Sequence, residues 1–179
     1  FWDPVENASL MPWLTATALV HSLIVTDQRR LFNAMSILLA IISFSLSLLG
    51  TFLVRSGILI SVHSFASDPT RGMFILMLLG FFTGGALILY SLRLKKERRL
   101  QLKIFSRESL LLLNNVFLCT AAGLILIGTL YPLLVELFDA GKLSVGPPYF
   151  NFVFLIPFLP MLCFMGWGVF SSWQDSELK

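Results

Sequence analysis

Charged side chains are scarce in this chain of 179 residues. Asp, Glu, Lys and Arg make up 13% of it, whereas soluble domains average about a quarter. Five stretches contain none of these residues: 8–26, 31–54, 72–92, 109–135 and 143–174. Each is long enough to cross the hydrocarbon core of a bilayer as a helix, which takes about 20 residues. The scarcity of charge therefore excludes an ordinary soluble domain.

The five stretches predict an all-α, polytopic membrane helix bundle. The runs do not alternate polar and apolar residues, so membrane strands are not expected. They recur along the whole chain, which excludes a signal peptide. Since the sequence does not begin with Met, we expect an internal segment of a longer membrane protein. The predicted transmembrane helices cover 9–26, 32–54, 73–93, 110–135 and 152–172.

The motifs of soluble enzymes and of metal clusters are also missing. The sequence has no P-loop, no Rossmann glycine signature and no Ser/His/Asp triad spacing. Its two cysteines, Cys119 and Cys163, form no CxxC pair and fall in apolar runs. We expect both to be small buried hydrophobic residues. No residue is an obvious general acid or base, so no catalytic residue is identified.

The few basic residues are unevenly distributed. Ten of the 13 lysines and arginines fall in the 27–30 turn, the 93–107 loop and the C-terminal tail. Cytoplasmic loops carry the excess of Lys and Arg. This asymmetry predicts that the N-terminal FWDPVENAS, the 55–72 loop and the 137–150 loop lie outside, in the periplasm of a bacterium. The alternative interpretation of the 93–107 cluster is a lipid or nucleic-acid patch.

Small residues and prolines predict how the helices pack. Gly80 and Gly84 form a GxxxG pair, which lets membrane helices approach closely. Pro157 and Pro160 predict a kink or a locally unwound turn in the fifth helix. Asn115 shares one face of the fourth helix with small residues. The second helix carries a small, hydroxyl-rich face: Ser36, Ala40, Ser43, Ser47 and Thr51.

Only two histidines occur, and one of them, His21, lies inside the first predicted helix. It follows Leu10 by about 16 Å of helical rise. An ionisable group at this depth is costly and is a functional candidate. A neutral imidazole can bind iron when a second group fixes its tautomer. The alternatives are an axial ligand or proton relay, and a structural hydrogen bond to a Ser or Thr of another helix.

The second histidine, His63, lies in the loop RSGILISVHSFASDPTRG. This segment is too apolar for a free loop and too short to span a bilayer, so we expect it to lie along the membrane surface. Arg55 and Arg71 bracket it and could contact an anionic ligand such as haem propionates. Asp68 or Thr70 is expected to cap the following helix. Plain anchoring at the interface is the alternative for this segment.

The predicted outer face therefore collects aromatic rings, a histidine, two arginines and two acidic residues. Phe1 and Trp2 supply flat apolar surfaces, and Asp3 and Glu6 supply charge. Such a set would suit a flat, metal-centred ligand with acidic edges. Asp3 and Glu6 are equally suited to the start of a helix, where the dipole favours anions.

Several quoted stretches resemble one family. FWDPVENASLMPWL resembles the end of the tryptophan-rich WWD signature of haem-handling proteins. LGTFLVRSGILISVHSFASDPTRGMF, SRESLLLLNN and GPPYFN are similar to the CcmF/NrfE family of cytochrome c-type biogenesis proteins. The four stretches follow in the same order as in that family. Tyr149 stands where the family usually has Phe, and we expect this difference to be harmless.

The resemblance implies a haem lyase of the bacterial inner membrane. Such a protein receives haem from the haem chaperone CcmE and works with the thiol-handling protein CcmH. It attaches haem by thioether bonds to the CxxCH motif of apocytochrome c. Alternatives are an NrfE-like lyase for a CxxCK site in a nitrite reductase, and a haem exporter or transporter. We expect membrane lipid as a partner and no nucleic acid.

The resemblance also implies site residues. His63 falls on a ligand of the external haem, and His21 falls on a ligand of a b-type haem (haem b) within the membrane. The remaining ligands are expected outside this chain. Residues 1–8 would then be the end of the WWD motif, 9–54 two helices, 55–72 the external loop and 73–179 three helices. The implied haem platform comprises Phe1, Trp2, Asp3, Pro4, Glu6 and Asn7.

Overall fold

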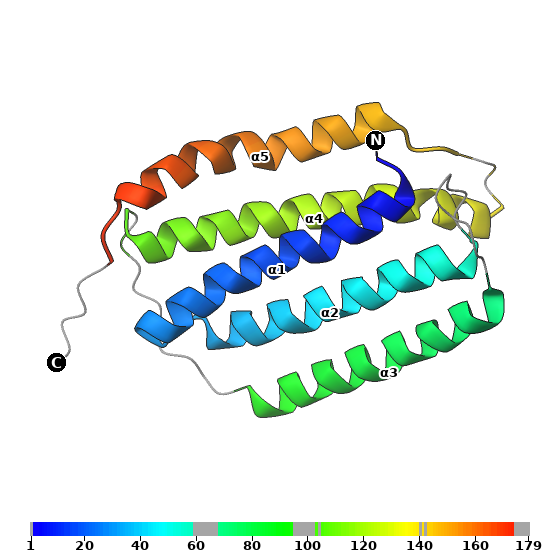
Figure 1. Cartoon of the computed structure of the whole chain (residues 1–179), viewed down its shortest axis with the longest axis horizontal. Helices are drawn as coiled ribbons and strands as arrows, with labels where there is room; N and C mark the ends of the chain where they lie inside the picture. The colour runs from blue at the N-terminus through cyan, green and yellow to red at the C-terminus, as the bar shows by residue number, and fades with distance from the viewer. Residues whose placement is uncertain are drawn as a thin grey trace.

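A computed structural model describes residues 2–58, 68–94, 103, 105–139, 141 and 143–173. Regular structure in these residues is entirely helical, as Figure 1 shows. All five helices are long and apolar enough to cross a membrane, so the predicted all-α polytopic bundle is confirmed. The helices are α1 (Pro4–Arg29), α2 (Asn33–Ser56), α3 (Pro69–Arg93), α4 (Arg107–Leu137) and α5 (Pro147–Phe170).

The helices lie side by side in one antiparallel row, in the order α5, α4, α1, α2, α3 (Figure 1). Each packs only against its neighbours in that row. The starts of α1, α3 and α5 and the ends of α2 and α4 form one end of the bundle, here called the Trp2 end. The opposite end is called the Glu108 end. The buried core is centred on α1 and α4, with Met11, Ala18, Leu118 and Ile125 among its residues.

Four helices, α1, α3, α4 and α5, begin earlier than the apolar runs predict, and polar side chains cap the first three of them. Asp3 caps α1 by accepting a hydrogen bond from the Val5 amide at 2.9 Å, so Glu6 lies in the first turn. Asp68 caps α3 through the amides of Thr70 and Arg71, which confirms the expected cap. Ser106 caps α4. A side-chain oxygen that satisfies free amides lets a helix start in polar sequence.

Hydroxyl groups join α1 to α2 along part of the predicted small face. Ser36 is buried and pairs with Ser22 at 2.8 Å and with Thr26 at 3.0 Å. Ser43 donates to Thr15 at 2.9 Å. The prediction is correct for these two serines. It is wrong for three residues of the same set, which are exposed: Ala40, Ser47 and Thr51.

The glycine pair of α3 does not make the contact that its spacing predicts. A Cβ added at Gly80 or Gly84 would meet nothing within 4 Å among the described residues. The close approach occurs instead at Gly50 of α2, which packs on the backbone of Ala8. The GxxxG prediction is therefore wrong within this chain, because α3 lies at the edge of the row and contacts α2 alone.

The two prolines inside α5 do not interrupt it. Pro157 and Pro160 both lie within the single helix Pro147–Phe170. Of the two expected alternatives, the locally unwound turn is therefore wrong, and the kink stays a prediction. A proline removes one amide donor and crowds the preceding turn, but the α5 helix continues on both sides.

We expect Gly50→Ala to destabilise the bundle by about 1–3 kcal/mol, the usual cost of overpacking. The new Cβ would lie 2.8 Å from the Ala8 carbonyl oxygen, and a backbone atom cannot swing aside. Gly80→Ala is the matched control, since it should gain about 0.5–1 kcal/mol from helix propensity alone. Unfolding of both variants in detergent, followed by circular dichroism, tests the contrast. Equal changes in the two variants would contradict it.

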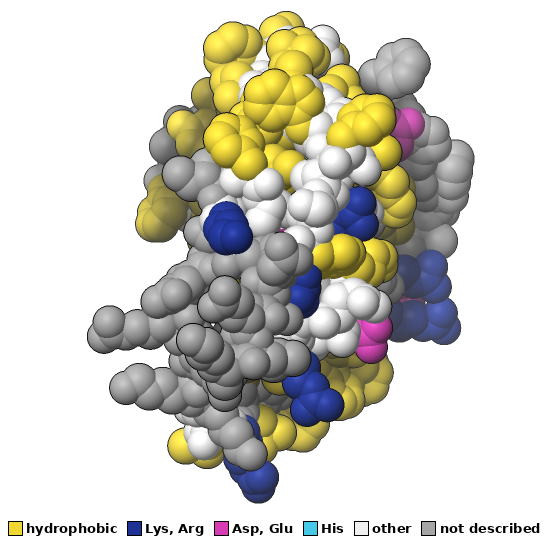
Figure 2. Space-filling view, turned by 90° about the vertical axis from the view of Figure 1, so that its left-hand side faces the viewer, with side chains coloured by type: hydrophobic (Ala, Val, Ile, Leu, Met, Phe, Trp, Pro, Cys, Tyr) yellow, Lys and Arg dark blue, Asp and Glu magenta, His cyan; other side chains and the backbone are white. Residues whose placement is uncertain are grey.

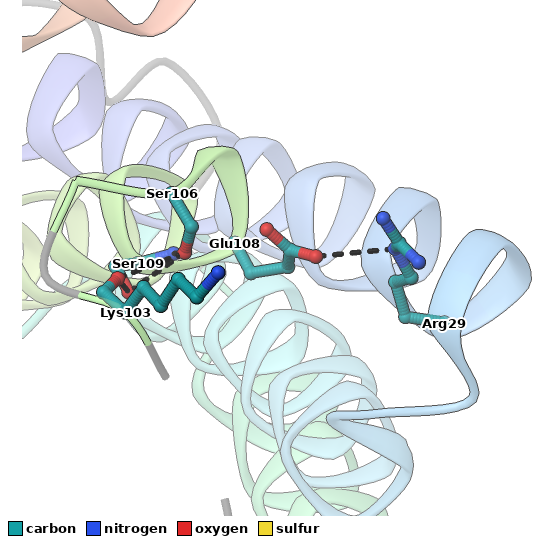
Figure 3. Close-up of polar contacts among 5 residues, drawn as sticks. All are labelled: Arg29, Lys103, Ser106, Glu108 and Ser109. Atoms are coloured by element: carbon teal, nitrogen blue, oxygen red, sulfur yellow. Dashed lines mark hydrogen bonds and ion pairs between the residues drawn. The ribbon is translucent and has the colours of Figure 1, made fainter. Parts of the chain in front are cut away.

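The Glu108 end is held by a polar cluster, shown in Figure 3. Arg29 Nε lies 3.1 Å from Glu108 Oε1, and the Glu108 side chain is 2% exposed. Ser106 and Ser109 donate to the Lys103 carbonyl oxygen at 3.0 Å and 2.6 Å. These contacts tie the end of α1 to the start of α4.

The segment after α5 joins the same cluster. The ring of Trp173 lies 5.7 Å from the Arg29 guanidinium and 5.3 Å from that of Arg107. The Arg107 amide donates to the Ser172 carbonyl oxygen at 3.1 Å. Figure 2 faces this end of the molecule and shows several Lys and Arg side chains on it. Cation–π contacts and one ion pair therefore join α1, α4 and the segment after α5.

Candidate functional site

Trp2 lies against the beginning of α5. Its ring stacks on Phe150 with centroids 5.3 Å apart and an interplanar angle of 15°, and it meets the edge of Phe154 at 5.7 Å. The indole Nε1 donates to Asn151 Oδ1 at 2.7 Å. The Trp2 backbone is left-handed, with φ 66, which is unusual for a bulky residue. Contacts with three residues of α5 hold the Trp2 side chain in place, while the Trp2 backbone has this unusual conformation.

Two cavities meet at Trp2. One, of about 550 Å³, lies between the start of α1 and the start of α5. The other, of about 410 Å³, lies between the start of α1 and the end of α4. Both sizes are within the usual range of ligand pockets. The first cavity is lined by Trp2, Glu6, Asn7, Leu10, Pro147 and Asn151. Trp2 and Asn7 also line the second, together with Pro4, Thr129, Glu136 and Phe150.

The structure thus brings together four of the predicted platform residues: Trp2, Pro4, Glu6 and Asn7. Asp3 differs from them, because its carboxylate caps α1. The observed contact of Asp3 therefore agrees with the interpretation that this residue starts a helix. Phe1 lies outside the described residues.

Asn7 lines both cavities. It is 1% exposed, and its Nδ2 donates to Thr129 Oγ1 at 3.1 Å. Thr129 in turn donates to the Ile125 carbonyl oxygen. These hydrogen bonds tie α1 to α4 at a residue that the two cavities share.

Asp68 connects the two arginines of the Trp2 end. Its amide donates to the Arg55 carbonyl oxygen at 2.8 Å, and its carboxylate lies 3.2 Å from Arg71 Nε. The Arg71 side chain is 69% exposed, and an exposed pair of this kind contributes about 0–1 kcal/mol. Arg55 lines a third cavity, of about 330 Å³, between α1 and α2. His63 lies outside the described residues.

His21 is half-buried in α1 and faces α4. Its Nδ1 lies 3.2 Å from Oδ1 of Asn115. A carboxamide oxygen can only accept, so this pair is a hydrogen bond when Nδ1 carries the proton, and Nε2 then keeps its lone pair. The structural alternative expected a Ser or Thr of another helix as the partner; the side chain found there is an amide, that of Asn115 on α4. His21 follows Glu6 by about 22 Å of helical rise, so it is separate from the Trp2 end.

The described residues contain no group of three or more His, Cys, Asp or Glu side chains that could hold a metal ion. Cys119 is half-buried and packs on the core, whereas Cys163 is exposed on α5. The predicted burial is therefore wrong for Cys163. Its helix packs on α4 alone, which leaves most of its surface open.

Comparison with known proteins identifies the relatives of this chain. Residues 1–60, which include α1 and α2, match the family described as Cytochrome C assembly protein. The chain is 56% identical over 180 residues to the cytochrome c-type biogenesis protein CcmF of Pseudomonas aeruginosa, with 100% of the chain aligned. A solved structure, Cytochrome c Heme Lyase CcmF, matches all of it with a TM-score of 0.73 and 32% identity. The chain belongs to the CcmF family.

The matches cover most or all of this chain but only a small part of the length of each relative. CcmF of Escherichia coli is 54% identical over 174 residues, 97% of the chain. The probable biogenesis protein NrfE of the same species is 49% identical over 152 residues, 84% of the chain. The chain spans 27% of the P. aeruginosa CcmF relative and 25% of the solved CcmF structure. The resemblance inferred from the four sequence stretches is confirmed.

Sequence reasoning missed the residues that position Trp2 in this CcmF segment. Phe150 and Asn151 belong to the GPPYFN stretch, which carried the resemblance without a role. Their partner, Trp2, lies almost the whole chain away in sequence, and no local pattern connects the two stretches. The only available signal was the predicted topology, which places both stretches at the same end. The hydroxyl of Tyr149, which a Phe at this position would lack, donates to the Leu124 carbonyl oxygen at 3.1 Å.

Proposed function

We propose that this chain is the haem-handling segment of a haem lyase of cytochrome c maturation. The intact protein would receive haem from the chaperone CcmE and attach it by thioether bonds to the CxxCH motif of apocytochrome c, which CcmH presents. The observation that carries the proposal is the anchored Trp2 ring, which lines two cavities at one end of a CcmF-family bundle. A fixed aromatic face is suited to a flat apolar macrocycle.

We place the Trp2 end on the periplasmic side of a bacterial inner membrane. The Glu108 end carries Arg29, Arg30, Arg93 and Arg107, whereas the Trp2 end carries Arg55 and Arg71 among the described residues. The positive-inside rule favours this orientation. Apocytochrome c and haem from the chaperone would then meet the Trp2 end from outside.

At the Trp2 end, haem is the substrate. The bound haem supplies the iron and the two vinyl groups that become thioethers. We assign its ligation to His63 and its apolar contacts to Phe1, Trp2 and Pro4. Arg55 and the exposed Arg71 are assigned to the propionates, because guanidinium groups bind carboxylates in pairs of hydrogen bonds. The protein thus supplies placement, with Asp3, Glu6 and Asn7 shaping the site from α1.

Inside the bundle, we assign His21 as an axial ligand of a haem b. The residues fit that group, because a proton on Nδ1 would donate to the Asn115 oxygen 3.2 Å away and would leave Nε2 as the metal-binding nitrogen. Bound haem b would supply one-electron chemistry. His21 and His63 are the two histidines of this chain, so a second imidazole ligand for this haem would come from another part of the intact protein.

We expect Trp2→Ala in the intact protein to lower covalent cytochrome c formation by tenfold or more. The variant loses a ring stack and a hydrogen bond, together about 1–3 kcal/mol of positioning, and about 1.4 kcal/mol corresponds to tenfold. Trp13→Ala is the control, since Trp13 is 62% exposed on α1. Haem staining of cytochrome c and haem transfer from the chaperone provide the measurements.

Two further variants sharpen this test. Trp2→Phe keeps a stacking ring but loses the bond to Asn151, so it should fall between wild type and Trp2→Ala. His63→Ala should lose haem transfer from the chaperone. A folded Trp2→Ala protein with normal transfer and normal cytochrome c yield would refute the platform assignment.

A further inference from the structure

Asn115 has a buried side-chain amide whose oxygen has a hydrogen-bonding neighbour and whose nitrogen has none among the described residues. It lies on α4, is 2% exposed, and presents Oδ1 to the His21 ring at 3.2 Å. Its Nδ2 is buried with no hydrogen-bond partner among the described residues. A buried donor without a partner costs about 1–3 kcal/mol. The side chain is therefore not accounted for by packing alone.

Other polar contacts between the helices show the contrast. Ser22 pairs with Ser36, Ser43 with Thr15 and Ser45 with Thr83, each as a hydroxyl pair. Those contacts join helices without leaving a buried donor unpaired, unlike the Asn115 amide. Asn114, the preceding residue on α4, also has one buried side-chain atom without a hydrogen-bond partner among the described residues, its Oδ1. What distinguishes Asn115 is that its Oδ1 lies 3.2 Å from the His21 ring.

We propose that Asn115 is the positioning residue that fixes the tautomer and sets the basicity of His21. This inference rests on the proposed role of His21 as an axial haem ligand. The Asn115 oxygen accepts Nδ1–H and holds the ring so that Nε2 faces away with its lone pair. A stronger acceptor at Nδ1 makes the imidazole a better electron donor to iron, and a missing acceptor makes it a poorer one. Asn115 thus tunes the reduction potential without touching the haem.

The test is a redox titration of the b-type signal in the purified intact protein. Asn115→Asp places a charged acceptor at Nδ1 with almost no change of shape, and should shift the midpoint potential to more negative values. Asn115→Leu removes the acceptor and should shift it to more positive values. The g values of the low-spin ferric haem should move in both variants. Asn114→Leu is the matched control, because Asn114 is the buried neighbour on α4 and its Oδ1 has no hydrogen-bond partner among the described residues.

The outcomes separate this inference from the proposed function. If His21→Ala keeps the b-type signal, the ligand assignment itself fails. If His21→Ala loses the signal but both Asn115 variants titrate like wild type, only the role of Asn115 fails. Loss of haem from both Asn115 variants would also overturn it, since the site would then need the amide for packing. Opposite shifts in the Asp and Leu variants, with an unchanged Asn114→Leu, support it.

Discussion

Replacement of His21 by Ala is expected to abolish the b-type signal of the reduced-minus-oxidised spectrum of the intact protein. The side chain is the one imidazole that the described part of the bundle offers at this depth, and a proton on Nδ1, held by the Asn115 oxygen 3.2 Å away, would leave the Nε2 lone pair for iron. Removal of an axial ligand removes the bond that retains the iron. The expected effect is all-or-none, and a haem spectrum measures it directly.

Two controls show whether the loss arises from ligation. His63→Ala should keep the b-type signal, since His63 is assigned to the haem at the Trp2 end. Added imidazole should restore part of the signal in His21→Ala, because the deleted side chain leaves room beside Asn115. A folded His21→Ala protein with an unchanged spectrum would show that the histidine is structural.

The second large effect is expected at the Glu108 end. Arg29→Met should destabilise the protein by about 3 kcal/mol, the lower part of the range for breaking a buried ion pair. The lower part applies because the Arg29 side chain is 20% exposed, whereas that of Glu108 is 2% exposed. Methionine keeps much of the volume of arginine but loses the charge, the 3.1 Å contact and the cation–π contact with Trp173. Figure 3 shows the pair that is broken.

Arg30→Met is the control for this prediction, since Arg30 is the exposed next residue and should change stability little. The double variant Arg29→Met with Glu108→Leu should recover much of the loss, because it leaves no buried charge. Detergent unfolding followed by circular dichroism provides the measurement. Equal losses in Arg29→Met and Arg30→Met would contradict a specific role for the ion pair.

This ion pair also bears on the histidine site. Arg29 follows His21 on α1, and Glu108 precedes Asn115 on α4, by about two helical turns in each case. Both contacts join the same two helices. The ion pair therefore helps to fix the register in which the Asn115 oxygen meets the imidazole.

The helices of this protein could be predicted because crossing a lipid core is decided by each segment alone. A run of about 20 residues without charge has a favourable transfer free energy whatever its neighbours are. The five runs accordingly became α1 to α5. The helix starts were misplaced because Asp3, Asp68 and Ser106 extend the helices into polar sequence. Such caps act through one or two local hydrogen bonds, which hydropathy does not detect.

Composition and motifs were also enough to predict the family and to place His21 inside the first helix. Which small residues meet depends on tertiary packing. Gly50 packs on Ala8, whereas Gly80 and Gly84 face open space, although glycine spacing alone favoured the latter. Tertiary packing likewise places Trp2 on Phe150 and the His21 ring beside the Asn115 amide. These pairs depend on the order of helices in the row, and that order arises from contacts between residues far apart in the chain, which no local pattern encodes.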